Sequence, residues 1–251
     1  MTPATAEPVE LVIGGVTYHV LRTPPEAVRI VWTDGGGGQL WTFPEAVRYL
    51  AERGETVDTA MNGGIFEPGG VPSGLLVQDG KVLRRVNRRD GEGNFFLKPN
   101  GVFLIGSAGA TVVATEEYPP KGVKVRYAVQ SGPLLLRRGK THPSFNAGSS
   151  SRLHRNGVGV TPEGVVVFAM SDFHSPKFPN LHEFAAAFRE LGCEDALFLD
   201  GDLSQMRWGE DLQRRSNPFG SIIAVVRKGG DDGENDRDGG PAPAAEGPTD
   251  R

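Results

Sequence analysis

The chain has 251 residues, 38% of them hydrophobic and 23% charged, so it can bury a core of ordinary size. Its formal charge of −4 is concentrated in residues 229–251, which carry a large excess of acids, and the rest is close to neutral. This balance argues against a general nucleic-acid-binding protein. No long apolar window predicts a membrane span, and the single cysteine, Cys193, excludes an internal disulfide framework and a cysteine-based zinc site.

The first half of the chain predicts a strand, a helix and a second strand. Apolar runs cover residues 28–32 and 57–61. Between them, Thr42 and Glu45 have the spacing of a helix cap, and Gly54 stops the helical run. The second strand leads directly into a polar residue and two glycines, Asn62, Gly63 and Gly64.

Turn dipeptides in the middle of the chain predict antiparallel hairpins. Asp79-Gly80 separates apolar residues 75–77 from 82–83, and Asn100-Gly101 separates 95–97 from 102–105. Residues 162–164, Pro-Glu-Gly, separate the runs 158–160 and 165–168 in the same way.

A second strand-helix-strand unit follows. Asn180 and Glu183 have capping-box spacing before a helical apolar face, and Gly192 stops the helix, with Cys193 expected to be a buried, inert thiol. The apolar runs 165–170 and 196–199 flank this helix, and the second run again ends in a polar residue and glycine, Asp200-Gly201. Because strand ends carry ligands in open mixed sheets, we expect Asn62 and Asp200 to lie close together in one cleft.

These elements predict an α+β fold, a single domain of mixed, mostly antiparallel sheets with a few flanking helices. The last predicted strand covers residues 222–226. We place an N-terminal extension at residues 1–15, the folded domain at 16–227 and a disordered acidic tail at 228–251, where apolar residues give way to Gly, Pro, Ala and acids.

No phosphate loop, dinucleotide-binding fingerprint or nucleophile elbow occurs, so we expect no nucleotide cofactor, and no cofactor of any other kind. The spacing of Asp172 and His174 hints at a metal, but a solvated loop explains it better and no metal is expected. The first ten residues lack a basic stretch followed by an apolar one, which predicts a cytoplasmic protein. An exported form is the alternative if the true start lies upstream.

Four motifs in order resemble the phosphodiester glycosidase family, which includes the animal N-acetylglucosamine-1-phosphodiester α-N-acetylglucosaminidase. The resemblance covers about residues 16–227, and it is strongest to an uncharacterised bacterial subgroup that also has turns like those at 67–69 and 97–101. The motifs begin at Asn62-Gly63-Gly64, Gln130-Ser131-Gly132, Arg155-Asn156-Gly157 and Asp200-Gly201, the last continuing to Ser204. Many relatives read Asp-Gly-Gly-Gly-Ser at the fourth motif, whereas this chain has Asp202 and Leu203 before Ser204, which puts the substrate in question more than the reaction.

The resemblance implies a hydrolase that cleaves a sugar from a glycosyl-1-phosphodiester, such as one in an envelope polymer or exopolysaccharide. A non-catalytic carbohydrate-binding protein and a glycosidase of ordinary glycosides are the alternatives. Its partner would be a carbohydrate or sugar phosphate, not a nucleic acid, and no oligomeric state is predicted.

Asp200 is the expected catalytic carboxylate, with Asp172 as the second and Asp202 competing for that role. Arg155 would hold the phosphate, because a guanidinium can bind two oxygens at once, although it could be an ordinary surface arginine. The remaining candidates would bind substrate or simply stabilise turns: Asn62, Gly63, Gly64, Gln130, Ser131, Gly132, Asn156, Gly201 and Ser204.

Overall fold

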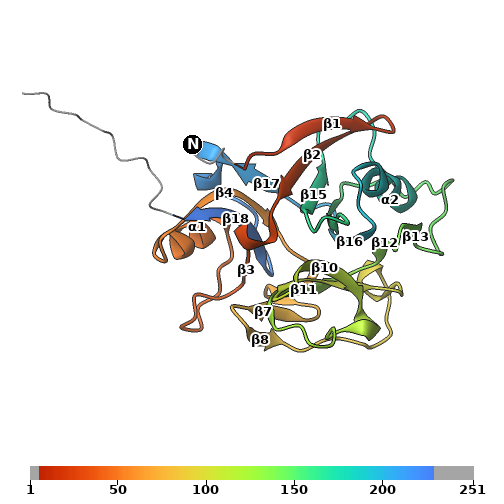
Figure 1. Ribbon diagram of the computed structural model, residues 1–251. Helices are drawn as coiled ribbons and strands as arrows, with labels where there is room; N and C mark the ends of the chain where they lie inside the picture. Colours follow the sequence, from red (N-terminus) through yellow and green to blue (C-terminus); the bar gives the residue numbers. More distant parts are fainter. Residues whose placement is uncertain (1–5, 229–251) are drawn as a thin grey trace, which may run out of the picture.

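Antiparallel sheets form the framework of residues 6–228, the part that the computed structural model describes (Figure 1). The largest sheet has seven strands. In spatial order they are β1 (Val9–Ile13), β2 (Val16–Thr23), β15 (Val166–Ser171), β14 (Asn156–Val160), β16 (Asp195–Asp200), β12 (Leu134–Arg137) and β13 (Lys140–Thr141).

Two smaller sheets complete the framework. The five-stranded sheet, at the bottom of Figure 1, has the order β10 (Gly109–Ala114), β9 (Gly101–Gly106), β11 (Val125–Ser131), β7 (Leu76–Gln78) and β8 (Lys81–Arg84). The four-stranded sheet has the order β17 (Met206–Trp208), β4 (Glu55–Asn62), β18 (Ile222–Lys228) and β3 (Val28–Val31). A separate two-stranded ribbon pairs β5 (Phe66–Glu67) with β6 (Val71–Pro72).

The two predicted strand-helix-strand units are present and are built alike. Helix α1 (Phe43–Ala51) connects β3 to β4, and α2 (Leu181–Glu190) connects β15 to β16. In each unit the two strands run parallel to each other, but a third, antiparallel strand lies between them: β18 in the first unit and β14 in the second. This split arrangement explains why all the paired strands among residues 6–228 are antiparallel although the chain order suggested a mixed sheet.

Both helices begin and end where the sequence predicts. The Glu45 carboxylate accepts from the Thr42 amide (2.9 Å) at the start of α1, and Asn180 and Glu183 exchange reciprocal hydrogen bonds at the start of α2. Gly54 and Gly192, with φ of +74° and +84°, follow the two helix ends in the left-handed conformation that glycine tolerates best. Neither helix has the length and apolar character needed to cross a bilayer, in the part of the chain described.

The predicted hairpins are confirmed in two cases and wrong in one. The turn at Asp79-Gly80 joins β7 to β8, and residues 162–164 lie in the turn between β14 and β15. Residues 95–97 do not form a strand: a 3-10 helix covers Asn94–Phe96, and the buried Asn100 side chain donates to the Phe95 carbonyl (2.7 Å). Asn100 therefore stabilises a loop that precedes β9, and β9 forms its hairpin with β10 instead.

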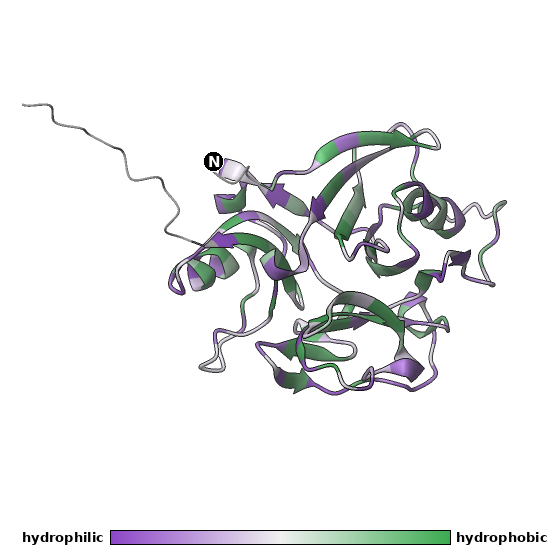
Figure 2. Cartoon of the chain, in the orientation of Figure 1, coloured by the Kyte–Doolittle hydropathy of each residue, from purple (hydrophilic) through white to green (hydrophobic). Residues whose placement is uncertain are grey.

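Apolar side chains from all three sheets share one core, which contains residues such as Phe103, Phe168 and Met206. Each helix closes a second layer on the outer face of its own sheet: α2 on the seven-stranded sheet and α1 on the four-stranded sheet. In Figure 2 the apolar colour accordingly concentrates on strands and helices rather than on connecting loops. The Cys193 thiol lies in the α2 layer, and burial raises its pKa to about 12, as expected of an inert cysteine.

The fold is dominated by sheets, with two α-helices in residues 6–228. The predicted domain start at residue 16 lies inside a hairpin, because β1 from the predicted N-terminal extension pairs with β2 along its whole length. The predicted acidic tail, apart from residue 228, lies outside the described residues.

Two glycines of the Arg155 motif allow β14 to pack directly against α2. A Cβ atom at Gly159 would lie 2.6 Å from Cys193 Sγ and 2.8 Å from Phe188 Cδ1, and one at Gly157 would lie 2.9 Å from the Leu197 carbonyl oxygen. These separations are shorter than van der Waals contact, so the motif requires glycine for packing.

We expect Gly159→Ala to lower the free energy of unfolding by about 1–3 kcal/mol, because the added methyl group must push β14 and α2 apart. Urea denaturation measures the change. Gly148→Ala is the matched control, since a Cβ there would have its nearest neighbour at 3.5 Å. Equal stability of the two variants would contradict the packing role of Gly159.

Candidate active site

The side chain of Asn62 connects both strand-helix-strand units. Asn62 ends β4 and is 1% exposed. Its Oδ1 accepts hydrogen bonds from the Gln205 amide (3.0 Å) and Asn156 Nδ2 (3.1 Å). Its Nδ2 donates to Asp200 Oδ2 (3.3 Å) and Ser204 Oγ (3.4 Å). The predicted proximity of Asn62 and Asp200 is therefore confirmed, and both donors and both acceptors of the amide are used.

Asp200 ends β16 in a partly buried position. Besides the bond from Asn62, its Oδ1 accepts from the Gly201 amide (2.8 Å). Burial raises the pKa of Asp200 to about 6; these two hydrogen bonds oppose the rise, and the charge of Asp202 adds to it. At neutral pH the group is mainly a carboxylate that binds a proton more readily than an ordinary aspartate.

A buried histidine fixes the loop that follows Asp200. His154 Nε2 lies 3.2 Å from the Ser204 carbonyl oxygen, and Nδ1 lies 3.1 Å from Ser171 Oγ. Because a carbonyl can only accept, Nε2 carries the proton, and Nδ1 accepts from the Ser171 hydroxyl. Ser171 Oγ in turn accepts from the Arg155 amide (3.0 Å), and burial lowers the pKa of His154, so this chain of bonds uses the neutral ring.

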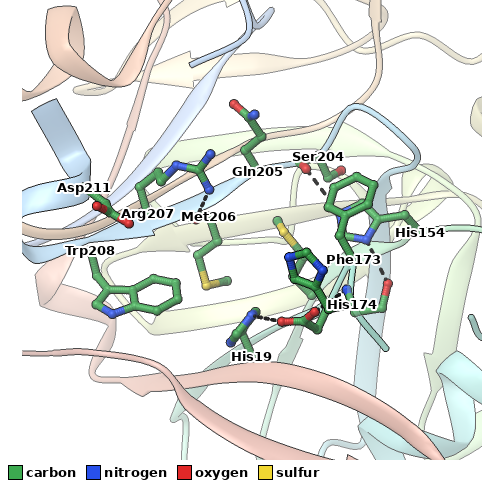
Figure 3. Close-up of a pocket in the computed structure, with 13 residues that line it drawn as sticks. His19, His154, Phe173, His174, Ser204, Gln205, Met206, Arg207, Trp208 and Asp211 are labelled. Carbon is green, nitrogen blue, oxygen red and sulfur yellow. Dashed lines mark hydrogen bonds and ion pairs between the residues drawn. The ribbon is translucent and has the colours of Figure 1, made fainter. Parts of the chain in front are cut away.

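A cleft of about 310 Å³ adjoins this polar group (Figure 3). Ser204 and Gln205 line it, and both are hydrogen-bonded to Asn62. Neither Asn62 nor Asp200 belongs to its wall, so the expectation that both line one cleft is wrong in that respect. The remaining lining residues are His19, His154, Met170, Ser171, Asp172, Phe173, His174, Met206, Arg207, Trp208 and Asp211.

Asp172, the predicted second carboxylate, lies in the wall of the cleft and is already hydrogen-bonded. Its Oδ2 is 2.6 Å from His19 Nε2, and its Oδ1 accepts from the His174 amide. Burial alone would raise the pKa of Asp172, but these contacts outweigh it and lower the pKa. Glu10, His19 and Asp172 offer possible metal-ligand atoms within 4.8 Å of one another. The His19 imidazole, however, directs Nε2 at Asp172 and Nδ1 at Glu10 (4.0 Å). This is the arrangement of a hydrogen-bonded His-Asp pair with a second acid nearby.

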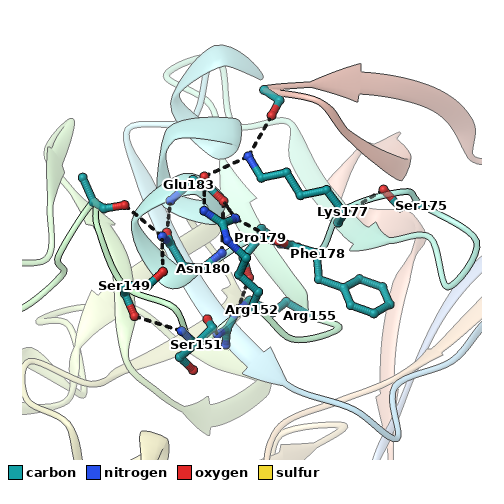
Figure 4. Close-up of polar contacts among 12 residues, drawn as sticks. Ser149, Ser151, Arg152, Arg155, Ser175, Lys177, Phe178, Pro179, Asn180 and Glu183 are labelled. Atoms are coloured by element: carbon teal, nitrogen blue, oxygen red, sulfur yellow. Dashed lines mark hydrogen bonds and ion pairs between the residues drawn. The ribbon is translucent and has the colours of Figure 1, made fainter.

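Arg155 is not placed as a phosphate ligand. It is 1% exposed, and its guanidinium donates from Nε to the Pro179 carbonyl (3.0 Å) and from Nη2 to the Ser151 carbonyl (3.0 Å) (Figure 4). Burial lowers the pKa of Arg155 to about 10. A guanidinium buried among these groups leaves little surface for a phosphate, so it acts as a structural support for the loops around residues 151 and 179.

The Gln130 motif also has a packing role. Gln130 Oε1 accepts from the Leu75 and Asn87 amides (3.0 and 2.8 Å), and Nε2 donates to the Asn87 carbonyl (2.6 Å). Ser131 Oγ donates to the Leu199 carbonyl (2.7 Å), next to Asp200. A Cβ at Gly132 would lie 2.5 Å from Asn100 Cβ. This motif therefore supports the active-site strand and does not supply a polar wall.

The glycines after Asn62 allow close approach of neighbouring backbone. A Cβ at Gly63 would lie 2.3 Å from Ser221 Oγ, and one at Gly64 would lie 2.9 Å from the Gln130 carbonyl oxygen.

Sequence reasoning missed His19, Arg207 and Trp208 in the cleft. Arg207 and Trp208 closely follow the Asp200 motif and could have been found there, whereas His19 is brought in by the pairing of β2 with β15.

A family model described as phosphodiester glycosidase matches residues 55–227, a span that contains the second unit, strand β4 of the first unit and all four motifs. The chain belongs to the phosphodiester glycosidase family. The resemblance predicted from the motifs is thereby confirmed. Within curated proteins, the chain is 32% identical over 216 residues to the uncharacterized protein YigE of Escherichia coli K12, covering 85% of this chain and 83% of YigE.

Solved structures share the family fold at low sequence identity. The catalytic domain of zebrafish N-acetylglucosamine-1-phosphodiester α-N-acetylglucosaminidase, auto-inhibited by its pro-peptide, matches with a TM-score of 0.63 at 16% identity, covering 87% of this chain and 81% of that one. A hypothetical protein from Synechocystis matches with a TM-score of 0.52 at 14% identity, covering 87% and 61%. A putative exported protein from Burkholderia pseudomallei matches with a TM-score of 0.51 at 13% identity, covering 84% and 74%.

We expect Arg155→Lys to lower the free energy of unfolding by about 1–3 kcal/mol, because one ammonium cannot reach both carbonyls that the guanidinium holds. Thermal denaturation followed by circular dichroism measures the change. Arg152→Lys is the matched control: Arg152 forms an exposed ion pair with Glu183, whose loss should cost less than about 1 kcal/mol. A stable Arg155→Lys variant that loses activity on phosphodiesters alone would contradict the structural role.

Proposed function

We propose that the protein hydrolyses the bond between a sugar and the phosphate of a glycosyl-1-phosphodiester. The observation that carries the proposal is the Asp200 carboxylate, which is partly buried, has a raised pKa and is oriented by Asn62 and Gly201. Ser204, which shares the Asn62 amide with Asp200, lines the cleft. Membership of the phosphodiester glycosidase family supports the reaction class. An envelope polymer or exopolysaccharide would be a source of such a substrate.

The reaction needs little acid catalysis on the leaving side, because a phosphate monoester leaves far more readily than an alcohol. With a pKa of about 6, Asp200 is mostly ionised at pH 7 and suited to act as a base. It would take a proton from water while the water oxygen bonds to the anomeric carbon. The bond from that carbon to the phosphate oxygen breaks with its electron pair, and the phosphate monoester departs.

Asp172 and Asp202 have different surroundings. Asp172 is held by His19 in the cleft wall, where it would orient the imidazole toward the substrate. Asp202 is exposed in the turn after Asp200 and affects it through charge. We therefore propose Asp172 rather than Asp202 as the second carboxylate of the site.

If Asp200 is the base, kcat/KM on a sugar-1-phosphodiester stays level above about pH 7 and falls about tenfold per pH unit well below its pKa, because protonation removes the base. A general acid would give the opposite limb, with loss above that pKa.

Asp200→Asn should reduce turnover by about two to four powers of ten. Asp202→Asn should keep turnover and move the acid limb to lower pH, because it removes a charge that raises the pKa of Asp200.

Circular dichroism first establishes that both variants fold. Parallel assays with a matched alkyl glycoside separate the proposed substrate from ordinary glycosides. Near-parent turnover by Asp200→Asn would refute the assignment of the base. Sugar binding without turnover in the parent would instead identify a carbohydrate-binding protein on the same scaffold.

A further inference from the structure

We propose that Arg207 binds the phosphate of the leaving group, at the open edge of β17. This inference rests on the proposed hydrolysis of a phosphodiester and deepens it by assigning the phosphate site. The reaction releases a phosphate monoester, and negative charge grows on it as the bond breaks. Arg155 was the arginine expected to bind this phosphate, but it is buried and donates to two backbone carbonyls. Arg155 is therefore not free to contact the phosphate, and the cleft offers another arginine, Arg207.

Arg207 lines the cleft, and the backbone geometry brings its guanidinium to the open edge of β17. β17 is an edge strand that pairs only with β4 in its sheet. The Gln205 carbonyl accepts from the Asn62 amide (3.3 Å), so it points toward β4, and the alternation along a strand turns the next carbonyl, that of Met206, outward. Arg207 Nη1 donates to this outward carbonyl (3.3 Å), which brings the guanidinium to the open edge (Figure 3).

Arg207 is a cation of the cleft whose charge is not balanced by a neighbouring carboxylate. Asp172 Oδ2 is paired with His19 (2.6 Å), and Asp211 Oδ1 is paired with Arg214 Nε (3.0 Å). Among residues 6–228, no ion pair involves Arg207. A half-buried guanidinium without a carboxylate partner is ready to form charge-assisted hydrogen bonds with phosphate oxygens.

The position of Arg207 relative to the base suits a glycosyl phosphate. Ser204, which lines the cleft, shares the Asn62 amide with Asp200. Arg207 is three positions after Ser204 in the chain, at most roughly 10 Å when the chain is extended. The proposal places the sugar ring between Ser204, which adjoins the base through the Asn62 amide, and the guanidinium. The exposed ring of His174 and the indole of Trp208 flank this space.

The test combines direct binding with turnover. Binding of glycerol 1-phosphate, a phosphate monoester like the proposed product, is measured by titration calorimetry for the parent, Arg207→Gln, Arg207→Lys and Arg138→Gln. Arg138 is the matched control, because its side chain is 77% exposed and does not line the cleft. The same proteins are assayed on a sugar-1-phosphodiester and on a neutral aryl glycoside, after circular dichroism has shown that each is folded.

We expect Arg207→Gln to weaken glycerol 1-phosphate binding about tenfold or more, and Arg207→Lys to weaken it less, because a charge remains without the fork. KM for the phosphodiester should rise in parallel, with the aryl glycoside and the Arg138 variant unaffected. Unchanged binding by Arg207→Gln, or no binding by the parent, would overturn the inference. If the parent binds through Arg207 yet hydrolyses neither substrate, the proposed function fails and the phosphate site stands.

Discussion

The active site depends on the Asn62 amide, which is buried where the two strand-helix-strand units meet. The backbone amide of Gln205 can only donate, and Asn156 Nδ2 also donates to the Asn62 backbone carbonyl. The Asn62 Oδ1 atom must therefore face these two donors, and Nδ2 must face Asp200 and Ser204. With two donors and two acceptors all engaged, the amide has one orientation. It thereby sets the ends of β4, β14 and β16 relative to one another.

This junction explains the chemistry that Asp200 can perform. Without these hydrogen bonds a carboxylate in the same place would have a still higher pKa, and a carboxylate in water would be a weaker base. The bonds from Asn62 and Gly201 favour the ionised form, while burial raises the proton affinity of Asp200 above that of an ordinary aspartate. A partly buried negative charge lowers the stability of the fold. The close packing at the motif glycines keeps the surrounding strands in place despite this cost.

Local signals in the sequence were sufficient to predict both helices, two hairpins and the meeting of Asn62 with Asp200, because caps, turns and strand ends act over a few residues. They did not reveal that β18 and β14 would insert between the strands of each unit, since that pairing joins distant segments. Nor could these signals distinguish a buried arginine from one that binds a ligand. The sequence motif suggested a phosphate ligand at Arg155, but the structure shows its guanidinium bonded to the Pro179 and Ser151 carbonyls. Arg207 gained its candidate role only from the edge position of β17.

Burial where the two units meet raises the proton affinity of Asp200 above that of an ordinary aspartate. Carbon-13 NMR of the aspartate carboxyl carbons, with Asp200 assigned by its loss in Asp200→Asn, measures its titration directly in the folded protein. We expect a midpoint at about pH 6. A midpoint near the ordinary value of about 4 would show that the carboxylate is solvated like any surface aspartate and would contradict its assignment as a tuned base.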